Sequence, residues 1–267
     1  MLSLHTNAAA LSTQNALGST NKALSSSMTK LGTGFRVNSA MDDAAGLQIA
    51  TRLKAQTSGM QVAQKNTQNG ISFLQTAEGA LDEVKNILIR MKDLATEHNT
   101  ATTSTDDQTA LDAEYKELVA EMDNILTNTS FGGLDVFGGA LAAAMDFQIG
   151  ASTAETLSMD AIAETTAVTG HGLTDLTADD IDGINDIITA VSTLRSKLGA
   201  TANRLEHTYN NLGNMIQNVS ASEGRIMDVD YATETSNMTS KQMLMQASTA
   251  MLKQSSSMSQ MVASLLQ

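Results

Sequence analysis

The chain has 267 residues with no proline and no cysteine, and 29 acidic against 16 basic residues give it a net charge of −13. The lack of cysteine excludes disulfides and thiolate metal sites. The acidic balance argues against a nucleic-acid partner, because phosphate binding needs clustered Lys and Arg. No stretch of the sequence is apolar for long enough to cross a membrane as a helix.

The charge is unevenly distributed along the chain. No acid precedes Asp42 and none follows Glu234, so residues 1–41 carry +3, residues 235–267 carry +2 and the middle carries −18. Residues 1–15 have no Lys or Arg and no continuous apolar stretch, so we expect no cleaved secretory signal peptide there. This charge distribution predicts two weakly charged arms that tend to associate, one on each side of an acidic middle segment. It favours an assembly subunit over an enzyme.

Both arms carry large apolar residues at a spacing of about seven, close to a coiled-coil seam. The two stripes are Leu4, Leu11, Leu17, Leu24 and Leu31 in the first arm, and Leu244, Met251, Met258 and Leu265 in the second. One interpretation is that the stripes meet neighbouring subunits, and the alternative is that they are ordinary core-facing helices. Because large apolar residues are few, we predict that the arms are disordered alone and fold when packed against other helices.

The middle begins with a pattern typical of a helical hairpin. Apolar residues at three-four spacing from Met60 to Ala95 predict a long helix, and the same spacing from Leu111 to Ile125 predicts a second one. The polar residues 99–105 separate them as a loop. We therefore expect two antiparallel helices with matching apolar faces.

After the helical hairpin, the spacing of apolar residues changes from the helical three-four pattern to alternation at every second residue. Alternation around Met145 and again around Leu157 predicts a β-hairpin near residues 145–162. Residues 163–176 are rich in Thr, Gly and Ala without a clear period, and we interpret them as a linker. From Ile184 to Val219 the three-four spacing returns over nearly ten helical turns, after Thr177 as the expected N-cap.

These elements predict a mainly α fold. We expect a long antiparallel helical bundle or coiled coil with a small β-hairpin, and with both termini as helical arms at the same end. The predicted domains are a terminal arm domain of residues 1–41 and 235–267 and a helical rod domain of residues 42–234.

Five segments of the chain resemble bacterial flagellins, in the same order. These segments are Leu31–Arg52, Asn69–Leu81, Asn203–Leu212, Arg225–Met238 and Ser264–Gln267. Together the resemblance covers about residues 1–137 and 177–267. It is specific because several separate motifs agree over most of the chain.

The resemblance implies a structural subunit that polymerises into the extracellular bacterial flagellar filament for swimming or swarming motility. The arms would form the inner tube and the rod domain the tube around it. Only about 15 residues separate Ile162 from Thr177, so the chain is similar to a minimal flagellin without outer variable domains. Its first seven residues resemble the lateral, swarming type. The alternative is a hook–filament junction protein, which shares the terminal pattern.

The family resemblance also implies partners. These are further copies of the chain, a flagellar export chaperone and the secretion apparatus, filament cap and hook-junction proteins, and the host Toll-like receptor that senses flagellin. Residues at the positions that matter for that receptor are Leu88, Arg90, Leu94 and Glu114. Ile89 and Lys92 differ from the usual Gln and Arg of receptor-active members. Leu88 also lies on the predicted helix seam.

Arg36, Asn38, Asp42 and Asp43 follow a break that Gly32 and Gly34 indicate between arm and rod. Asn38 or Ser39 is expected to cap the next helix, with the two aspartates at its positive end. The functional interpretation adds that Arg36 bridges to an acid on a neighbouring subunit.

We expect no catalytic, metal or cofactor site. The histidines His5, His98, His171 and His207 are far apart and do not have metal-ligand spacing. Asp175, Asp179, Asp180 and Asp182 are similar to the start of a calcium loop, but Thr189 stands where a bidentate Glu would be needed. We interpret these aspartates as acids at a helix start.

Overall fold

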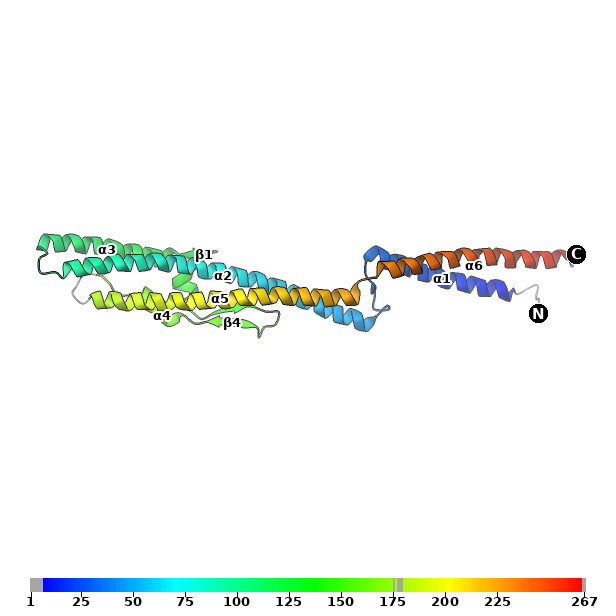
Figure 1. Cartoon of the computed structure of the whole chain (residues 1–267), viewed down its shortest axis with the longest axis horizontal. Coiled ribbons are helices and arrows are strands. Elements are labelled where there is room, and N and C mark those ends of the chain that lie inside the picture. Colours follow the sequence, from blue (N-terminus) through cyan, green and yellow to red (C-terminus); the bar gives the residue numbers. More distant parts are fainter. Residues whose placement is uncertain (1–6, 175, 177–179, 266–267) are drawn as a thin grey trace. The chain divides into compact units, whose positions relative to one another are not determined.

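The computed structural model describes residues 7–174, 176 and 180–265. Its helices are α1 (Ala8–Thr33), α2 (Ala44–His98), α3 (Thr105–Asn128), α4 (Ile162–Thr169), α5 (Asp180–Met227) and α6 (Tyr231–Leu265) (Figure 1). Two small strand pairs lie between α3 and α4 in chain order. The predicted mainly α fold is therefore confirmed. Within the described ranges, no helix has the length and apolar character needed to cross a membrane.

Packing divides the chain into two compact units. One comprises Met1–Ala55 and Asn218–Gln267, and the other comprises Gln56–Gln217. Helices α2 and α5 each contribute to both units, so the unit boundaries fall inside helices. The boundaries that the sequence predicted, at residues 41/42 and 234/235, remain a proposal.

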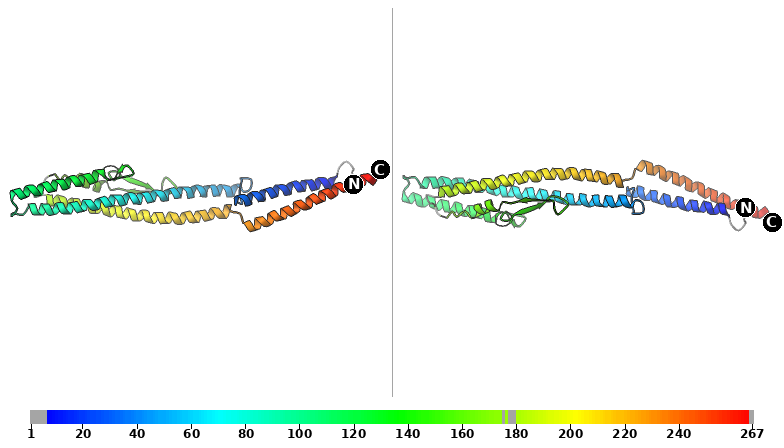
Figure 2. Two further views of the ribbon diagram at one scale, coloured as in Figure 1. Left: turned by 90° about the horizontal axis from the view of Figure 1, so that it is seen from above. Right: turned by 90° about the horizontal axis from the view of Figure 1, so that it is seen from below.

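The first unit is built on an antiparallel pair of helices, α1 and α6, which run side by side in both views of Figure 2. At one end the Asn7 amide donates to the carbonyl oxygen of Ser255 over 3.1 Å. At the other end the Val229 N–H donates to the carbonyl oxygen of Gly34 over 2.9 Å. Both helical arms therefore extend in the same direction from the point where α1 ends and α6 begins, as predicted.

The second unit has its core between α2, α3 and α5. Helix α5 runs antiparallel to α2, since Arg195 of α5 lies 2.9 Å from Asp82 while Leu205 lies beside Gly70. Helix α3 returns along α2, since Gln108 of α3 lies beside His98 and Glu114 lies beside Arg90, which confirms the helical hairpin. The largest fully buried side chains of the unit are aliphatic except for two aromatic rings, and they include Leu74, Leu81, Tyr115, Met122, Phe137 and Leu194. Thr177, the expected cap of α5, lies outside the described residues.

The β-structure follows α3. Strands β1 (Ser130–Phe131) and β2 (Leu134–Asp135) pair around a two-glycine turn, and a single π-helical turn, η1 (Val136–Ala140), follows them. Strands β3 (Met145–Gln148) and β4 (Thr156–Met159) then form an antiparallel pair in which Phe147 lies opposite Leu157. Both of these side chains are buried in the core. The predicted β-hairpin near residues 145–162 is confirmed.

The prediction of a linker over residues 163–176 is wrong for its first half, where the chain forms α4. Ala161, Thr165 and Val168 recur at helical spacing and are buried. Glu164 on the other face forms an ion pair with Lys197 of α5 at 2.8 Å. A helix was missed there because its buried face consists mainly of small residues that give little apolar signal.

Candidate assembly interface

Two faces of α6 differ in exposure. Half-buried side chains recur at three-four spacing along the helix and form the face that packs on α1. They are Met238, Lys241, Met245, Ser248, Leu252 and Ser255. The predicted stripe of Leu244, Met251 and Met258 precedes Met245 and Leu252 by one residue, a rotation of about 100° around the helix.

That rotation leaves the predicted stripe in solvent. Leu244 is 49% exposed, Met251 64% and Met258 54%. The side chain of Leu265 lies outside the described residues. Helix α6 thus has two apolar heptad stripes, and we call Leu244, Met251 and Met258 the outer stripe. The sequence interpretation found this stripe but missed the inner one, although Met245 and Leu252 show the same seven-residue spacing.

The predicted stripe of the first arm is divided in the structure. Leu17, Leu24 and Leu31 lie on the face of α1 that packs on α6, and Leu24 is buried. Leu11 is 55% exposed and lies off this face. It stands six positions before Leu17, whereas a heptad repeat would place it seven positions before. Leu4 lies outside the described residues. Among the described side chains of α1 and α6, only Leu24 and Ser27 are buried.

A short clasp joins the two chain segments where α1 ends and α6 begins. Gly34 has φ 77° and caps α1, since its N–H donates to the carbonyl oxygen of Lys30. The Arg36 N–H donates to the Met227 carbonyl over 2.6 Å, and Phe35 pairs with Asp228 as an antiparallel bridge. We define the clasp as residues 34–36 and 227–229.

Arg36 contributes its side chain to the same clasp. Its guanidinium donates to the carbonyl oxygen of Ile226, near the end of α5, over 2.8 Å. Cations are favoured at this position because carbonyls at a helix C-terminus carry partial negative charge. The expected bridge from Arg36 to an acid on another subunit remains a proposal, since this contact lies within one chain.

The helix cap after the clasp is Asp43. Its carboxylate accepts from the Gly46 N–H over 2.8 Å, at the start of α2. Asn38 and Ser39 were expected in this role, and the structure corrects this expectation. Their backbone N–H groups instead donate to the Asp42 carboxylate, which closes the turn before α2. The N–H donors of Asn38 and then Ser39 lower the pKa of Asp42.

The four predicted receptor positions divide between surface and core. Arg90 and Glu114 are both about half exposed, and the guanidinium donates twice to one carboxylate oxygen, over 2.9 and 2.6 Å. Leu88 and Leu94 are buried between the helices and are almost inaccessible to solvent. Only the charged pair is therefore available to a partner of the isolated chain, and the leucines act in packing.

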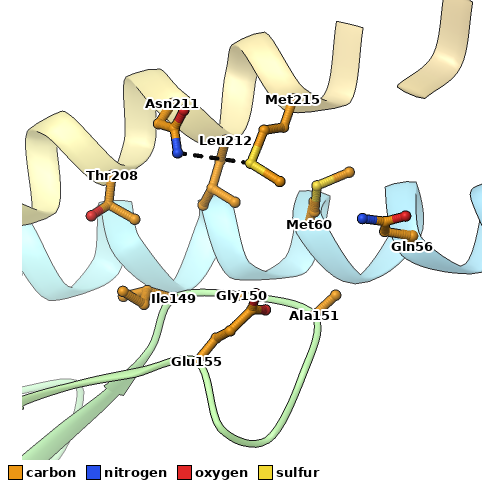
Figure 3. Close-up of a pocket in the computed structure, with 10 residues that line it drawn as sticks. All are labelled: Gln56, Met60, Ile149, Gly150, Ala151, Glu155, Thr208, Asn211, Leu212 and Met215. Carbon is orange, nitrogen blue, oxygen red and sulfur yellow. Dashed lines mark hydrogen bonds between the residues drawn. The ribbon is translucent and has the colours of Figure 1, made fainter. Parts of the chain in front are cut away.

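A pocket of about 230 Å³ lies under the β3–β4 turn, between α2 and α5 (Figure 3). Met60 and Leu212 line it, and the Asn211 amide donates to the Met215 sulfur at its edge. The one carboxylate in its lining, Glu155, already accepts from the Ser152 N–H. In the part of the chain that the structure describes, no group of three or more metal-ligating side chains is present.

Comparison with known proteins places this arrangement in a family. A family model described as "Bacterial flagellin N-terminal helical region" matches residues 4–142, which is more than half of the chain. The chain belongs to the flagellin family. A second flagellin model, "Bacterial flagellin C-terminal helical region", matches residues 181–266. The resemblance of the sequence motifs to flagellins is thereby confirmed, and the family is one of structural proteins rather than enzymes.

Individual flagellins match over nearly their whole length. The chain is 43% identical to a flagellin of Halalkalibacterium halodurans, over 90% of each protein, and 40% identical to the flagellin of Bacillus subtilis, over 97% of this chain and 98% of that one. It is 34% identical to the flagellar filament 33 kDa core protein of Treponema phagedenis, at similar coverage. The crystal structure of Bacillus cereus flagellin matches with a TM-score of 0.50 at 34% identity, over 55% of this chain and 88% of that one.

Proposed function

We propose that the chain is a structural subunit of the extracellular flagellar filament, and that copies assemble through their helical arms. The exposed outer stripe of α6 carries this proposal. A surface of Leu244, Met251 and Met258 in contact with water is unfavourable, and burial against identical helices removes the exposed apolar area. The relative named as a flagellar filament core protein supports the same conclusion.

The composition of the arms suits dense packing of identical helices. Lys241 and Lys253 are the charged residues of the chain after Glu234. Like charges repeated at each subunit of a helical tube would repel, whereas Ser, Thr and Gln side chains hydrogen-bond between helices. We therefore assign residues 1–41 and 235–267 to the inner tube of the filament and residues 42–234 to the rod around it.

We further propose that the arms complete their folding on assembly. The α1–α6 pair buries Leu24 and Ser27 and leaves the remaining described side chains of both helices at least partly exposed. A helix pair with so little burial depends for its stability on further packing against neighbouring helices. Assembly onto existing filament ends supplies that packing, and free subunits remain soluble until then.

The proposed partners follow from this assembly route. Subunits leave the cell through the flagellar secretion apparatus with an export chaperone, and they meet filament cap and hook-junction proteins at the filament ends. Cysteine-free chains and weakly packed arms are compatible with passage in an unfolded state. The flagellin names of the relatives favour the filament subunit over the hook–filament junction protein.

A second proposed role is recognition by the host Toll-like receptor that senses flagellin. The observation in its favour is the exposed pair of Arg90 and Glu114, which presents a planar cation and an acid side by side on α2 and α3. Such charged side chains are available for hydrogen bonds to a partner protein. Leu88 and Leu94 support this surface from beneath.

Seeded polymerisation followed by electron microscopy tests the filament function. The full chain is expected to form long filaments, and a version that lacks residues 1–34 and 235–267 is expected to remain a soluble monomer. A full-length chain that stays monomeric in the presence of filament seeds would favour the junction-protein alternative.

A further inference from the structure

Methionines of the outer stripe combine high exposure with easily oxidised sulfur. Met251 is 64% exposed and Met258 54%, and both lie on the same face of α6. The chain has 16 methionines, and those of the second unit's core, such as Met91 and Met122, are fully buried. Oxidation of a thioether follows its accessibility to the oxidant.

We propose that Met251 and Met258 are oxidation sites whose sulfoxides prevent the subunit from joining a filament. The oxidant is hydrogen peroxide in the surrounding medium. The thioether sulfur attacks one peroxide oxygen, the O–O bond breaks, and an S–O bond forms. Sulfur is oxidised by two electrons, and the other oxygen leaves as hydroxide, which takes the proton of the transferred oxygen and becomes water. This inference rests on the proposed filament function, because it assumes that the outer stripe becomes buried on assembly.

The sulfoxide changes the chemistry of the stripe at its centre. A thioether is apolar and flexible and adapts to irregular packing, whereas the sulfoxide has a polar S–O group that requires a hydrogen-bond partner. Leu244 and the methionines offer no donor to such a group. Burial of the stripe against a neighbouring helix therefore becomes unfavourable in each oxidised subunit.

The free subunit is expected to tolerate the same reaction. Both side chains are already more than half exposed, on a face of α6 that lies about 100° around the helix from the face that packs on α1. Oxidation adds an oxygen atom without displacing a neighbour in the chain. Oxidation should thus impair assembly without unfolding the subunit. Because every subunit of a homopolymer carries the same sulfoxides, the effect on filament growth should be strong.

Other exposed methionines provide internal controls. Met41 is 96% exposed in the turn before α2, outside the outer stripe. Met215 is 37% exposed on α5. Both should be oxidised as well, and their oxidation alone should not stop polymerisation.

The experiment treats the purified full chain with hydrogen peroxide, maps sulfoxides by mass spectrometry, and measures seeded polymerisation and helix content. The matched variants are Met251→Leu/Met258→Leu, which preserves the apolar stripe without sulfur, and Met41→Leu. Oxidised wild-type chain and oxidised Met41→Leu should need a monomer concentration about tenfold higher or more for growth. Oxidised Met251→Leu/Met258→Leu keeps the exposed methionines Met28, Met243 and Met261 and should be inhibited far less than the oxidised wild-type chain, and helix content should remain unchanged in all samples.

Two results would overturn the inference while leaving the filament function intact. One is unimpaired growth of wild-type chain that carries sulfoxides at both positions. The other is equal inhibition of the leucine variant. Failure of the untreated wild-type chain to form filaments on seeds would instead contradict the proposed function, and the inference with it. Recovery of growth after treatment with a methionine sulfoxide reductase would support reversible control of assembly.

Discussion

Gly34 and Val229 are joined by a hydrogen bond of 2.9 Å from the valine N–H to the glycine carbonyl, where α1 ends and α6 begins. Gly34 adopts φ 77°, in the left-handed region, and a Cβ there would lie 3.0 Å from the Tyr231 hydroxyl. Only glycine fits this position without strain. The clasp therefore depends on one residue that combines a helix stop with a close contact to α6.

Substitution Gly34→Ala is expected to destabilise the α1–α6 unit by about 1–2 kcal/mol, because a side chain in the left-handed region is strained. Thermal unfolding followed by circular dichroism measures the change. Gly32→Ala is the matched control, since a Cβ at Gly32 meets nothing within 4 Å and α1 should gain helix propensity. Equal stability of the two variants would contradict the role assigned to Gly34.

A close approach also defines Gly70 of α2. A Cβ there would lie 2.9 Å from the Phe147 ring of β3 and 3.2 Å from Leu205 of α5. Gly70→Ala is expected to destabilise the second unit by about 1–3 kcal/mol, because the added methyl group overpacks the core. The higher helix propensity of alanine offsets part of this loss. Gly79→Ala in the same helix has open space and should stabilise by about 0.5–1 kcal/mol. Chemical denaturation of both variants would show opposite shifts, and shifts of the same sign would be inconsistent with this packing.

Acid should weaken the start of α6. Asp230 accepts from the Thr233 hydroxyl and from the Ala232 N–H, and these bonds lower the pKa of its carboxyl in the folded chain. A lowered folded pKa contributes stability above the unfolded value of 3.8, and this contribution is lost as pH falls through the folded value. Asp230→Asn keeps an acceptor that does not titrate, so its thermal stability should depend less on pH in the acidic range than that of the wild type. Identical pH profiles in thermal melts would exclude this contribution.

The charged pair on α2 and α3 should matter for recognition and little for folding. Arg90→Ala and Glu114→Ala are each expected to lower activation of the flagellin-sensing Toll-like receptor by about tenfold in a reporter-cell assay. Exposed ion pairs contribute about 0–1 kcal/mol, so the thermal stability of both variants should change little. Lys65→Ala, at another exposed position of α2, is the control. A response unchanged from wild type would remove Arg90 and Glu114 from the proposed receptor surface.

Polar substitution of the outer stripe should separate folding from assembly. Leu244→Gln/Met251→Gln is expected to leave monomer helix content unchanged and to abolish seeded polymerisation, because two uncharged polar groups would be buried in each subunit contact. Thr249→Gln introduces glutamine at another exposed position of α6 and should still polymerise. Light scattering with filament seeds measures both. Normal growth of the double variant would show that the outer stripe remains in solvent in the filament.

The sequence predicted the elements in which large apolar residues repeat strongly. Helices α2, α3 and α5 follow three-four spacing of Leu, Ile, Val and Met, and strands β3 and β4 follow alternation around Phe147 and Leu157. Helix α4 was missed because Ala161 and Thr165 contribute too little apolar contrast. Patterns of large residues therefore identify cores, while small-residue contacts emerge only when neighbouring elements are in place.

The candidate interface was predicted in part. The outer stripe of α6 was found by its heptad spacing, but spacing alone does not decide which of two adjacent stripes faces a partner helix. Burial in the structure separates Met245 and Leu252, which face α1, from Met251 and Met258. Likewise, the role of Asp43 as helix cap depends on where α2 begins, and several Asx and Ser residues in a row left that position open.

The central claim is that the outer stripe becomes buried between subunits, and a thiol probe tests it most directly. Because the chain has no cysteine, Met251→Cys provides a unique site for maleimide labelling. Labelling should be fast in the monomer, strongly slowed in the seeded filament, and fast again after the filament is dissociated. Equal labelling rates in monomer and filament would contradict assembly through this face of α6.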